Sequence, residues 1–166
     1  MRFDICCDDR DGIVIIDKAY LDELNDELLY EFDILLDPKG ESELVYDFDD
    51  KWEDVWNNKT QGIRDFCNKG KLCLWLLNQL NEEWSMVEDE NLQISRRGID
   101  VTSGHIIVVL ASELVQCLMY PELEMETLAE LELKKGWYNL SKEGRVIRYS
   151  STTEKKQMII NVSLDN

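Results

Sequence analysis

The spacing of apolar residues divides the chain into stretches typical of strands and helices. Residues 2–6 and 12–16 are extended in pattern and flank a turn-like sequence at 8–12, which predicts a hairpin. Asp17 is a suitable helix N-cap, and apolar residues recur behind it at helical spacing to about Leu36. Asp37-Pro38-Lys39-Gly40 has turn chemistry that ends this helix. The alternation at 44–48 predicts a half-buried strand.

The middle of the chain predicts helices. Trp52 and Trp56 share one face of a short helix, and Thr60 is placed to cap the next. We expect the helical pattern to resume after a break at Gly70. The run 72–77 is apolar on every side, so this segment is expected at the centre of the core.

The second half predicts strands around one further helix. The β-branched run at 105–110 is the expected central strand, with short strands at 92–95 and 99–101. Ser112 and Glu113 begin a helix that Pro121 interrupts and that resumes to about Lys134. Residues 136–140, 145–150 and 157–164 predict an antiparallel meander. Helices and strands do not alternate regularly, so residues 1–166 predict a single α+β domain.

Composition indicates a folded chain. Its 166 residues are 44% hydrophobic and 9% aromatic, too rich for a disordered protein. The longest apolar run, 106–111, falls short of the roughly 20 residues of a spanning helix, and the N-terminus lacks an apolar signal sequence. The five cysteines match no disulfide framework. We therefore expect a cytoplasmic protein with reduced thiols, Cys67 and Cys117 being buried.

The negative charge is concentrated in the first third of the chain. Residues 1–50 hold seventeen Asp or Glu and four Lys or Arg, which is −13 of the net −17. Solubility alone would be served by an even distribution. Such a charge opposes direct binding to nucleic acid, which requires a basic surface, and to anionic membrane lipid.

No catalytic residue, metal site or cofactor site is predicted. His105 is the sole histidine, and the sequence 101–105 lacks both glycines of a Gly-x-Ser-x-Gly nucleophile turn. The cysteine spacing is unlike a zinc site, and Lys18 stands where an EF-hand beginning at Cys7 requires Glu. Gly70-Lys71 lacks the first glycine and the final Ser or Thr of a P-loop.

The acidic residues are the candidate binding site. If the first helix buries its apolar face, its opposite face carries carboxylates, and a second acidic cluster surrounds Trp52. We expect these side chains to contact a basic protein partner, because complementary charge speeds association and selects partners. A merely solvated acidic face is the alternative. The expected partner-binding residues are Asp22, Glu23, Asp26, Glu27, Asp33, Asp47, Asp49, Asp50, Trp52, Glu53 and Asp54.

In size, acidity, aromatic content and absence of catalytic motifs, the chain resembles bacterial immunity proteins, including those of contact-dependent growth inhibition and related polymorphic toxin systems. Nucleases are basic because their substrate is anionic, so an inhibitor that covers such a site tends to be acidic. The resemblance implies a non-catalytic protein that neutralises a cognate, nuclease-type toxin by direct binding. It carries over no residue roles.

Three alternatives stay open. One is a phage-type nucleic-acid mimic that inhibits host DNA-binding enzymes, with acidic residues spaced like phosphates. Another is a carboxylate-dependent metal hydrolase, which requires several Asp or Glu in one pocket. The last is a structural subunit of a larger complex.

Overall fold

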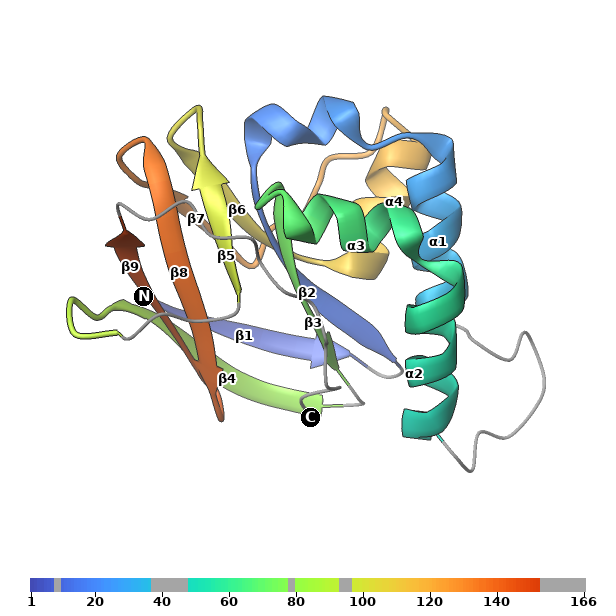
Figure 1. Cartoon of the computed structure of the whole chain (residues 1–166), viewed down its shortest axis with the longest axis horizontal. Coiled ribbons are helices and arrows are strands. Elements are labelled where there is room, and N and C mark those ends of the chain that lie inside the picture. Colours follow the sequence, from blue (N-terminus) through green and yellow to red (C-terminus); the bar gives the residue numbers. More distant parts are fainter. Residues whose placement is uncertain (8–9, 37–47, 78–79, 93–96, 153–166) are drawn as a thin grey trace.

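The computed structural model describes residues 1–7, 10–36, 48–77, 80–92 and 97–152, with the backbone alone for 48–53 and 80. Figure 1 shows the elements within these ranges. The helices are η1 (a 3-10 helix, Lys18–Glu23), α1 (Asp26–Leu36), α2 (Phe48–Lys59), α3 (Gln61–Asn68) and α4 (Ala111–Met119). The strands are β1 (Arg2–Cys7), β2 (Asp11–Asp17), β3 (Leu72–Leu77), β4 (Leu80–Glu88), β5 (Arg97–Val101), β6 (His105–Leu110), β7 (Ala129–Glu132), β8 (Gly136–Glu143) and β9 (Val146–Thr152).

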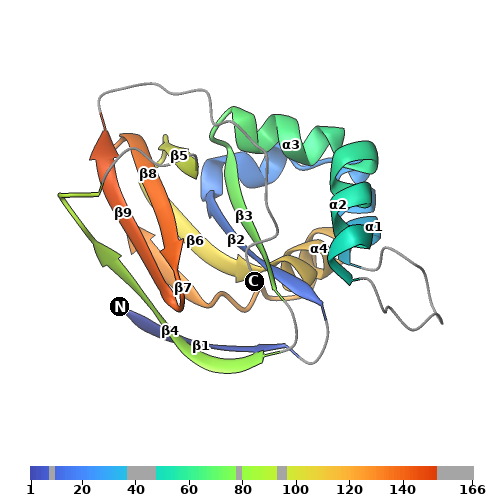
Figure 2. The same cartoon turned by 60° about the horizontal axis from the view of Figure 1, so that its bottom comes forward.

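The strands form two sheets. Sheet A has the order β1-β4-β9-β8-β5 and is mixed, because β4 and β9 run parallel. Sheet B has the order β3-β2-β6-β7, and its strands are antiparallel. Figure 2 shows the strands of sheet A on the side of the molecule away from the helices. This is the α+β class that the sequence predicts.

Sheet B is the middle layer and is buried on both faces. The inter-sheet core lies between the two sheets and includes Ile13, Ile15 and Trp75 of sheet B with Trp84 and Ile147 of sheet A. The helix-side core lies between the opposite face of sheet B and the helices. It joins Val14, Ile16, Leu74, Ile107 and Val109 to Leu28, Leu29, Phe32, Leu35, Val55, Trp56, Ile63, Leu114 and Val115.

Several predictions from the sequence are confirmed. Asp17 is the N-cap of η1, and its side chain accepts a hydrogen bond from the Ala19 amide at 2.8 Å. The β-branched run forms β6, an inner strand of sheet B, and β8 and β9 pair as the first two strands of the predicted meander. Helices begin near Trp52, after Thr60 and at Ala111. Cys67 and Cys117 are buried.

The predicted N-terminal hairpin is wrong. Both segments are strands, but β1 pairs with β4 in sheet A while β2 pairs with β3 and β6 in sheet B. Consecutive strands of the chain therefore belong to different sheets. Ile5 and Ile13 meet in the inter-sheet core as members of opposite layers.

The predicted continuous helix from Asp17 to Leu36 is also wrong. It is divided into η1 and α1, with Leu24 extended at φ −76° and ψ 114°. Asn25 caps the second part, because its side-chain oxygen accepts the Leu28 amide at 3.0 Å. Thr60, in contrast, does not cap α3 with its side chain; its hydroxyl donates to the Trp56 carbonyl at 2.6 Å.

Two predicted helices are strands. The apolar run 72–77 forms β3 and is central in the core, as expected, but it is extended rather than helical. Residues 129–132, expected in the resumed helix that ends near Lys134, form β7 at an edge of sheet B.

Some predictions concern residues outside the described ranges. These include most of the strand expected at 44–48, whose last residue, Phe48, begins α2, the strand at 92–95 apart from Leu92, and the strand at 157–164. Within the ranges that are described, none of the helices has both the length and the apolar character needed to cross a membrane.

Candidate functional site

Helix α1 separates an apolar face from an acidic one. Leu28, Leu29, Phe32 and Leu35 are buried in the helix-side core. Asp26, Glu27 and Asp33 are exposed, as the sequence predicts. Their carboxylates form no ion pair with Lys or Arg in the described part of the chain. Three negative charges therefore face solvent from one helix.

Tyr30 lies within this acidic face and is 65% exposed. It follows Asp26 by four residues and precedes Asp33 by three, so the three side chains form one stripe along the helix. The residues predicted from the sequence are acidic ones and Trp52, and they do not include Tyr30. Its place in the helical repeat, opposite Leu28 and Phe32, is the signal that could have identified it. We call Asp26, Glu27, Tyr30 and Asp33 the α1 face.

The two acidic residues predicted just before α1 differ from each other. Asp22 is exposed and makes no ion pair within the described ranges. Glu23 binds the ammonium group of Lys71, which also lies 5.5 Å from the centroid of the Tyr20 ring. The charge of Glu23 is thus compensated within the molecule. Because the helix is broken at Leu24, Asp22 and Glu23 do not share a continuous helix with Asp26 and Glu27.

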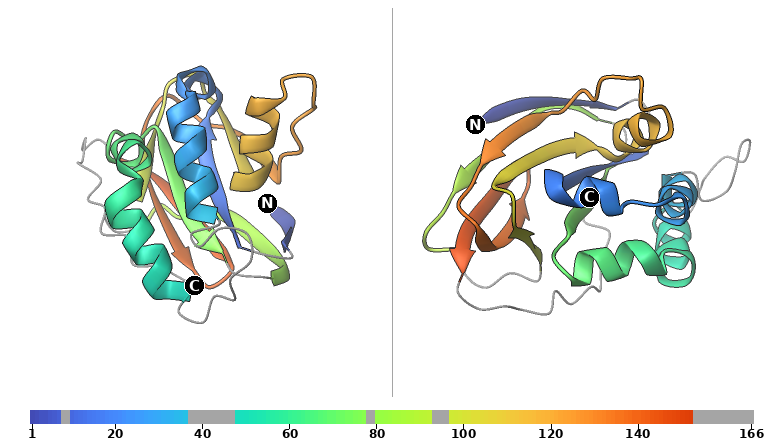
Figure 3. Two further views of the ribbon diagram at one scale, coloured as in Figure 1. Left: turned by 90° about the vertical axis from the view of Figure 1, so that its right-hand side faces the viewer. Right: turned by 90° about the horizontal axis from the view of Figure 1, so that it is seen from above.

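The second acidic cluster belongs to the start of α2. Asp47 lies outside the described residues, and for Asp49, Asp50, Trp52 and Glu53 the backbone alone is described, within the helix. Asp54 is exposed and accepts a hydrogen bond from the Asn58 amide group at 2.9 Å. Val55 and Trp56 of α2 pack in the helix-side core with Phe32 of α1. The two helices therefore lie side by side, as Figure 3 shows.

Two acidic residues of the first third have internal roles. Asp11 is buried and accepts the Ser112 amide at 3.0 Å at the start of α4, as well as the Ser112 hydroxyl. Asp17 is buried at the end of β2 and accepts the Thr102 and Ser103 amides at 2.8 and 2.9 Å. Part of the concentrated acidity therefore holds the fold together, and only the remainder is available at the surface.

The hydrogen bonds around Asp17 change its acidity. Burial by itself would raise the pKa of the Asp17 carboxyl, because it disfavours the charged form. The Ser103 hydroxyl and the amides of Ala19, Ser103 and Thr102 donate to the carboxylate and together outweigh burial, so the pKa lies below its ordinary value. Asp17 is thus held in its ionised form.

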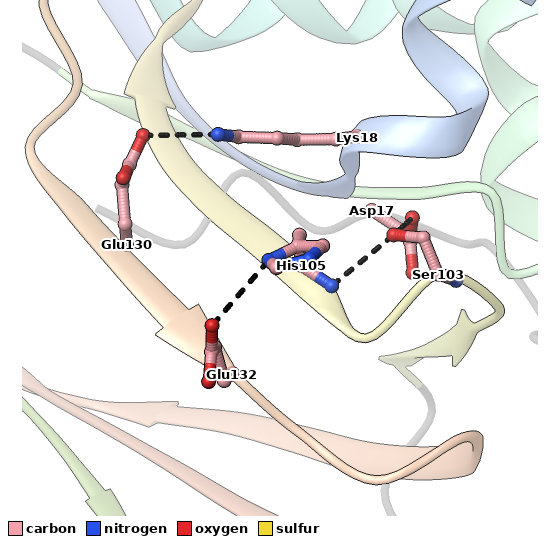
Figure 4. A network of polar contacts seen from close by, with 6 residues as sticks. All are labelled: Asp17, Lys18, Ser103, His105, Glu130 and Glu132. Carbon is pink, nitrogen blue, oxygen red and sulfur yellow. Dashed lines mark hydrogen bonds and ion pairs between the residues drawn. The ribbon is translucent and has the colours of Figure 1, made fainter.

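Asp17, Ser103 and His105 approach one another but do not form a catalytic triad. Figure 4 shows their arrangement. The Ser103 hydroxyl donates to Asp17 at 2.5 Å, and the backbone amide of His105 donates to the Ser103 oxygen at 3.1 Å. The imidazole instead faces Glu132, with Nδ1 at 3.8 Å from the carboxylate. A triad requires the imidazole between the hydroxyl and the acid. This arrangement instead stabilises the turn between β5 and β6 and does not activate Ser103.

One hollow in the described part of the chain has a volume of about 640 Å³. It lies beside the link between β7 and β8 and is lined in part by Glu88, Lys134, Lys135, Trp137 and Tyr138. The Tyr138 hydroxyl is already engaged, since it donates to the Lys134 carbonyl at 2.8 Å. Burial and then the charge of Glu88 raise the pKa of Tyr138, which favours the neutral phenol.

Among the described residues, no three His, Cys, Asp or Glu side chains are grouped so that they could hold a metal ion. A second hollow of about 260 Å³ is lined by Lys18, His105 and Glu130 among others. Lys18 and Glu130 pair across it at 3.3 Å. The α1 face, with its exposed carboxylates and Tyr30, is the candidate binding site.

The comparisons with known proteins identify no relative, since no family model, curated protein or solved structure matches the chain.

Proposed function

We propose that the chain is a non-catalytic acidic protein that binds a basic protein partner through the α1 face. Its finer role, in this proposal, is that of an immunity protein that neutralises a cognate, nuclease-type toxin by covering its active site. The observation that carries the proposal is the exposure of Tyr30 between unpaired carboxylates on a helix whose other face is fixed in the core.

The two kinds of side chain on the α1 face serve different parts of binding. Carboxylates attract a basic partner over a distance and raise the association rate. An exposed tyrosine supplies large apolar area and one hydroxyl with few rotatable bonds, and tyrosine is enriched among the residues that dominate binding energy. Charge alone would also serve solubility, but solubility gives no reason to expose Tyr30.

The position of α1 supports the same proposal. Four apolar residues hold the helix against sheet B, so the α1 face is rigid before a partner arrives and loses little conformational entropy on binding. Helix α2 packs beside it and carries the second acidic cluster. A basic surface that covers both helices would meet the α1 face and Asp54 of α2.

The test is a charge reversal with a matched control. The tagged parent chain is used to capture proteins from its native host, and the captured protein is identified by mass spectrometry and purified. Its association with the parent is then compared with that of the variant Asp22→Lys, Asp26→Lys, Glu27→Lys. These positions are exposed, so the variant is expected to fold. The control is Asp4→Lys, Glu90→Lys, Glu143→Lys, at exposed positions elsewhere with the same change in net charge.

We expect the test variant to lose at least tenfold in association rate at low salt and the control to lose much less. Raising the salt from 0.1 M to 1 M shortens the Debye length from about 10 Å to about 3 Å and should abolish the difference. Equal rates for test and control variants would show that the α1 face is only solvated. A host DNA-binding enzyme captured in place of a toxin would favour the nucleic-acid mimic.

A further inference from the structure

A second exposed feature lies at the end of α4. Met119, Tyr120 and Leu123 are 51%, 50% and 43% exposed, and Pro121 between them is exposed as well. We call these four residues the α4 knuckle. Together with Met1 and Tyr30, the three large side chains are the exposed large hydrophobic residues of the described chain. Single exposed apolar residues are ordinary, but three within five positions form a patch.

The backbone of the knuckle is fixed rather than loose. The Tyr120 amide donates to the Gln116 carbonyl at 2.9 Å, and the Leu123 amide donates to the Tyr120 carbonyl at 3.0 Å. Further along, the Glu126 amide donates to the Glu113 carboxylate at 3.0 Å, and Met125 packs against the helix-side core. The segment is therefore held at both ends, and its apolar side chains are presented in a defined arrangement.

The surroundings of the knuckle are acidic. Glu122, Glu124 and Glu126 are exposed. Residues 111–133 contain six Glu and no Lys, Arg or His. The acidic rim disfavours binding of this patch to a second copy of the chain, because that copy carries the same rim and a net charge of −17. It disfavours binding to anionic membrane lipid for the same reason. Charge complementarity selects a basic protein surface.

The helix that ends at the knuckle packs beside α1. Leu114 and Val115 of α4 pack in the helix-side core with Leu28 and Phe32 of α1. Figure 3 shows α4 beside α1, with the segment after α4 projecting from the same layer. One partner that covers the helical layer can therefore reach both features.

We propose that the α4 knuckle is an apolar anchor that inserts into a hydrophobic pocket, rimmed by Lys and Arg, on the basic partner. This rests on the proposed function and adds a second contact to it. The α1 face supplies the long-range attraction, and the knuckle supplies the short-range apolar burial that slows dissociation. Truncating a central buried tyrosine at an interface costs about 2 kcal/mol or more, which corresponds to roughly thirtyfold in affinity.

The first experiment places a photo-crosslinking amino acid, benzoylphenylalanine, at position 120 of the full chain in its native host. Parallel chains carry it at position 30 and at position 143. Glu143 is exposed at the β8–β9 turn of sheet A, away from the helical layer, and serves as the control. We expect the same basic protein to be recovered from positions 120 and 30 and not from 143.

The second experiment measures affinity with the purified protein recovered from position 120. Tyr120→Ala should weaken its binding at least tenfold, mainly through faster dissociation, and the weakening should persist at high salt. Gln116→Ala, at an exposed position on α4, is the matched control and should bind as the parent does. Thermal unfolding of each variant establishes that the fold is retained.

The outcomes separate the two proposals. Crosslinks from position 30 without any from position 120 would overturn the anchor role of the knuckle and would leave the proposed function standing. If neither position yields a crosslinked protein, the anchor and the proposed function are both overturned. A crosslink from 120 to a second copy, to a protein that is not basic, or to a protein recovered equally from 143 would overturn the anchor, as would unchanged affinity of Tyr120→Ala.

Discussion

The hydroxyl of Ser103 donates to the carboxylate of Asp17 at 2.5 Å, across 86 positions of the chain. Asp17 ends β2, and Ser103 lies in the turn that joins β5 of sheet A to β6 of sheet B. The same carboxylate accepts two amides of this turn and caps η1. One buried charge thus fixes the point where the two sheets and the first helix meet.

This relationship predicts a large loss of stability for Asp17→Ala. Removing the carboxylate leaves several amide donors without a partner, and a hydrogen bond to a charged group contributes about 1.5–3 kcal/mol. Ser103→Ala should cost less, because Asp17 keeps its three amide donors. Urea unfolding of both variants measures the free energies. A smaller loss for Asp17→Ala than for Ser103→Ala would contradict this account.

The same site predicts an acid dependence of stability. The pKa of Asp17 is lower in the folded chain than its ordinary value of about 3.9, so its ionised form stabilises the fold. That contribution is complete above the ordinary pKa and is lost as the pH falls through the lower folded pKa. The difference in unfolding free energy between the parent and Asp17→Asn should therefore be constant from pH 7 to about 5 and shrink at lower pH. A difference that grows on acidification would refute the assignment.

Two glycines provide a matched test of backbone strain and packing. Gly70 and Gly144 both have positive φ, at 69° and 59°. A Cβ at Gly70 would lie 2.4 Å from Cζ3 of Trp137, whereas a Cβ at Gly144 would meet nothing within 4 Å. Gly144→Ala should cost about 1 kcal/mol from strain alone, and Gly70→Ala should cost clearly more. Calorimetric or urea unfolding decides, and similar losses would mean that Trp137 moves aside freely.

His105→Ala should leave both folding and biological activity intact. The imidazole is exposed, lies 3.8 Å from Glu132, and is bonded to neither Ser103 nor Asp17 in the manner of a triad. The backbone amide that donates to Ser103 survives the substitution. We expect a change in unfolding free energy within about 0.5 kcal/mol. Loss of activity in a variant that still folds would contradict the non-enzyme proposal.

The thiols should divide into one reactive group and four protected ones. Cys6 is exposed, while Cys7, Cys67, Cys73 and Cys117 are buried. Burial raises the pKa of Cys73 to about 12, and burial followed by the hydrogen bond to Glu113 raises that of Cys117. The thiolate is the nucleophile. Native protein at pH 8 should therefore react rapidly with Ellman's reagent at one thiol, and the other four thiols should react only after unfolding. Rapid reaction of two or more thiols would be inconsistent with this core.

The parts of the fold that the sequence predicts correctly are those determined by local signals. Asp17 caps a helix, Gly144 and Arg145 turn the chain between β8 and β9, and Trp56 lies on the inner face of a helix. The errors arise where distant partners decide. Residues 72–77 are buried on both faces between two layers, so they lack the alternation that marks a strand and resemble a buried helix. The partner of β1 is β4, far along the chain, which no local pattern indicates.

The sequence predicts the exposed carboxylates of the candidate site but not the helix break or the exposed apolar residues near it. The exposure of Asp26, Glu27 and Asp33 follows from the positions of Leu28, Phe32 and Leu35 on one helix. The break at Leu24, which the sequence does not predict, places Asp22 and Glu23 outside the helix that carries Asp26 and Glu27. The sequence predicts the knuckle residues within a helix that Pro121 interrupts. Their exposure depends on Pro121 ending the helix and on β7 drawing the following chain into sheet B.

Strand β2 links the two hydrophobic cores into one cooperative unit. Its successive side chains belong alternately to the two cores, Ile13 and Ile15 to one and Val14 and Ile16 to the other. Neither core can open without displacing the strand that the other depends on, so the helical layer and sheet A are thermodynamically linked. A partner bound only to the helices would then slow amide hydrogen exchange in β4 and β9, on the opposite side of the molecule. Binding of a partner at one surface would in this way protect both sheets against unfolding and proteolysis.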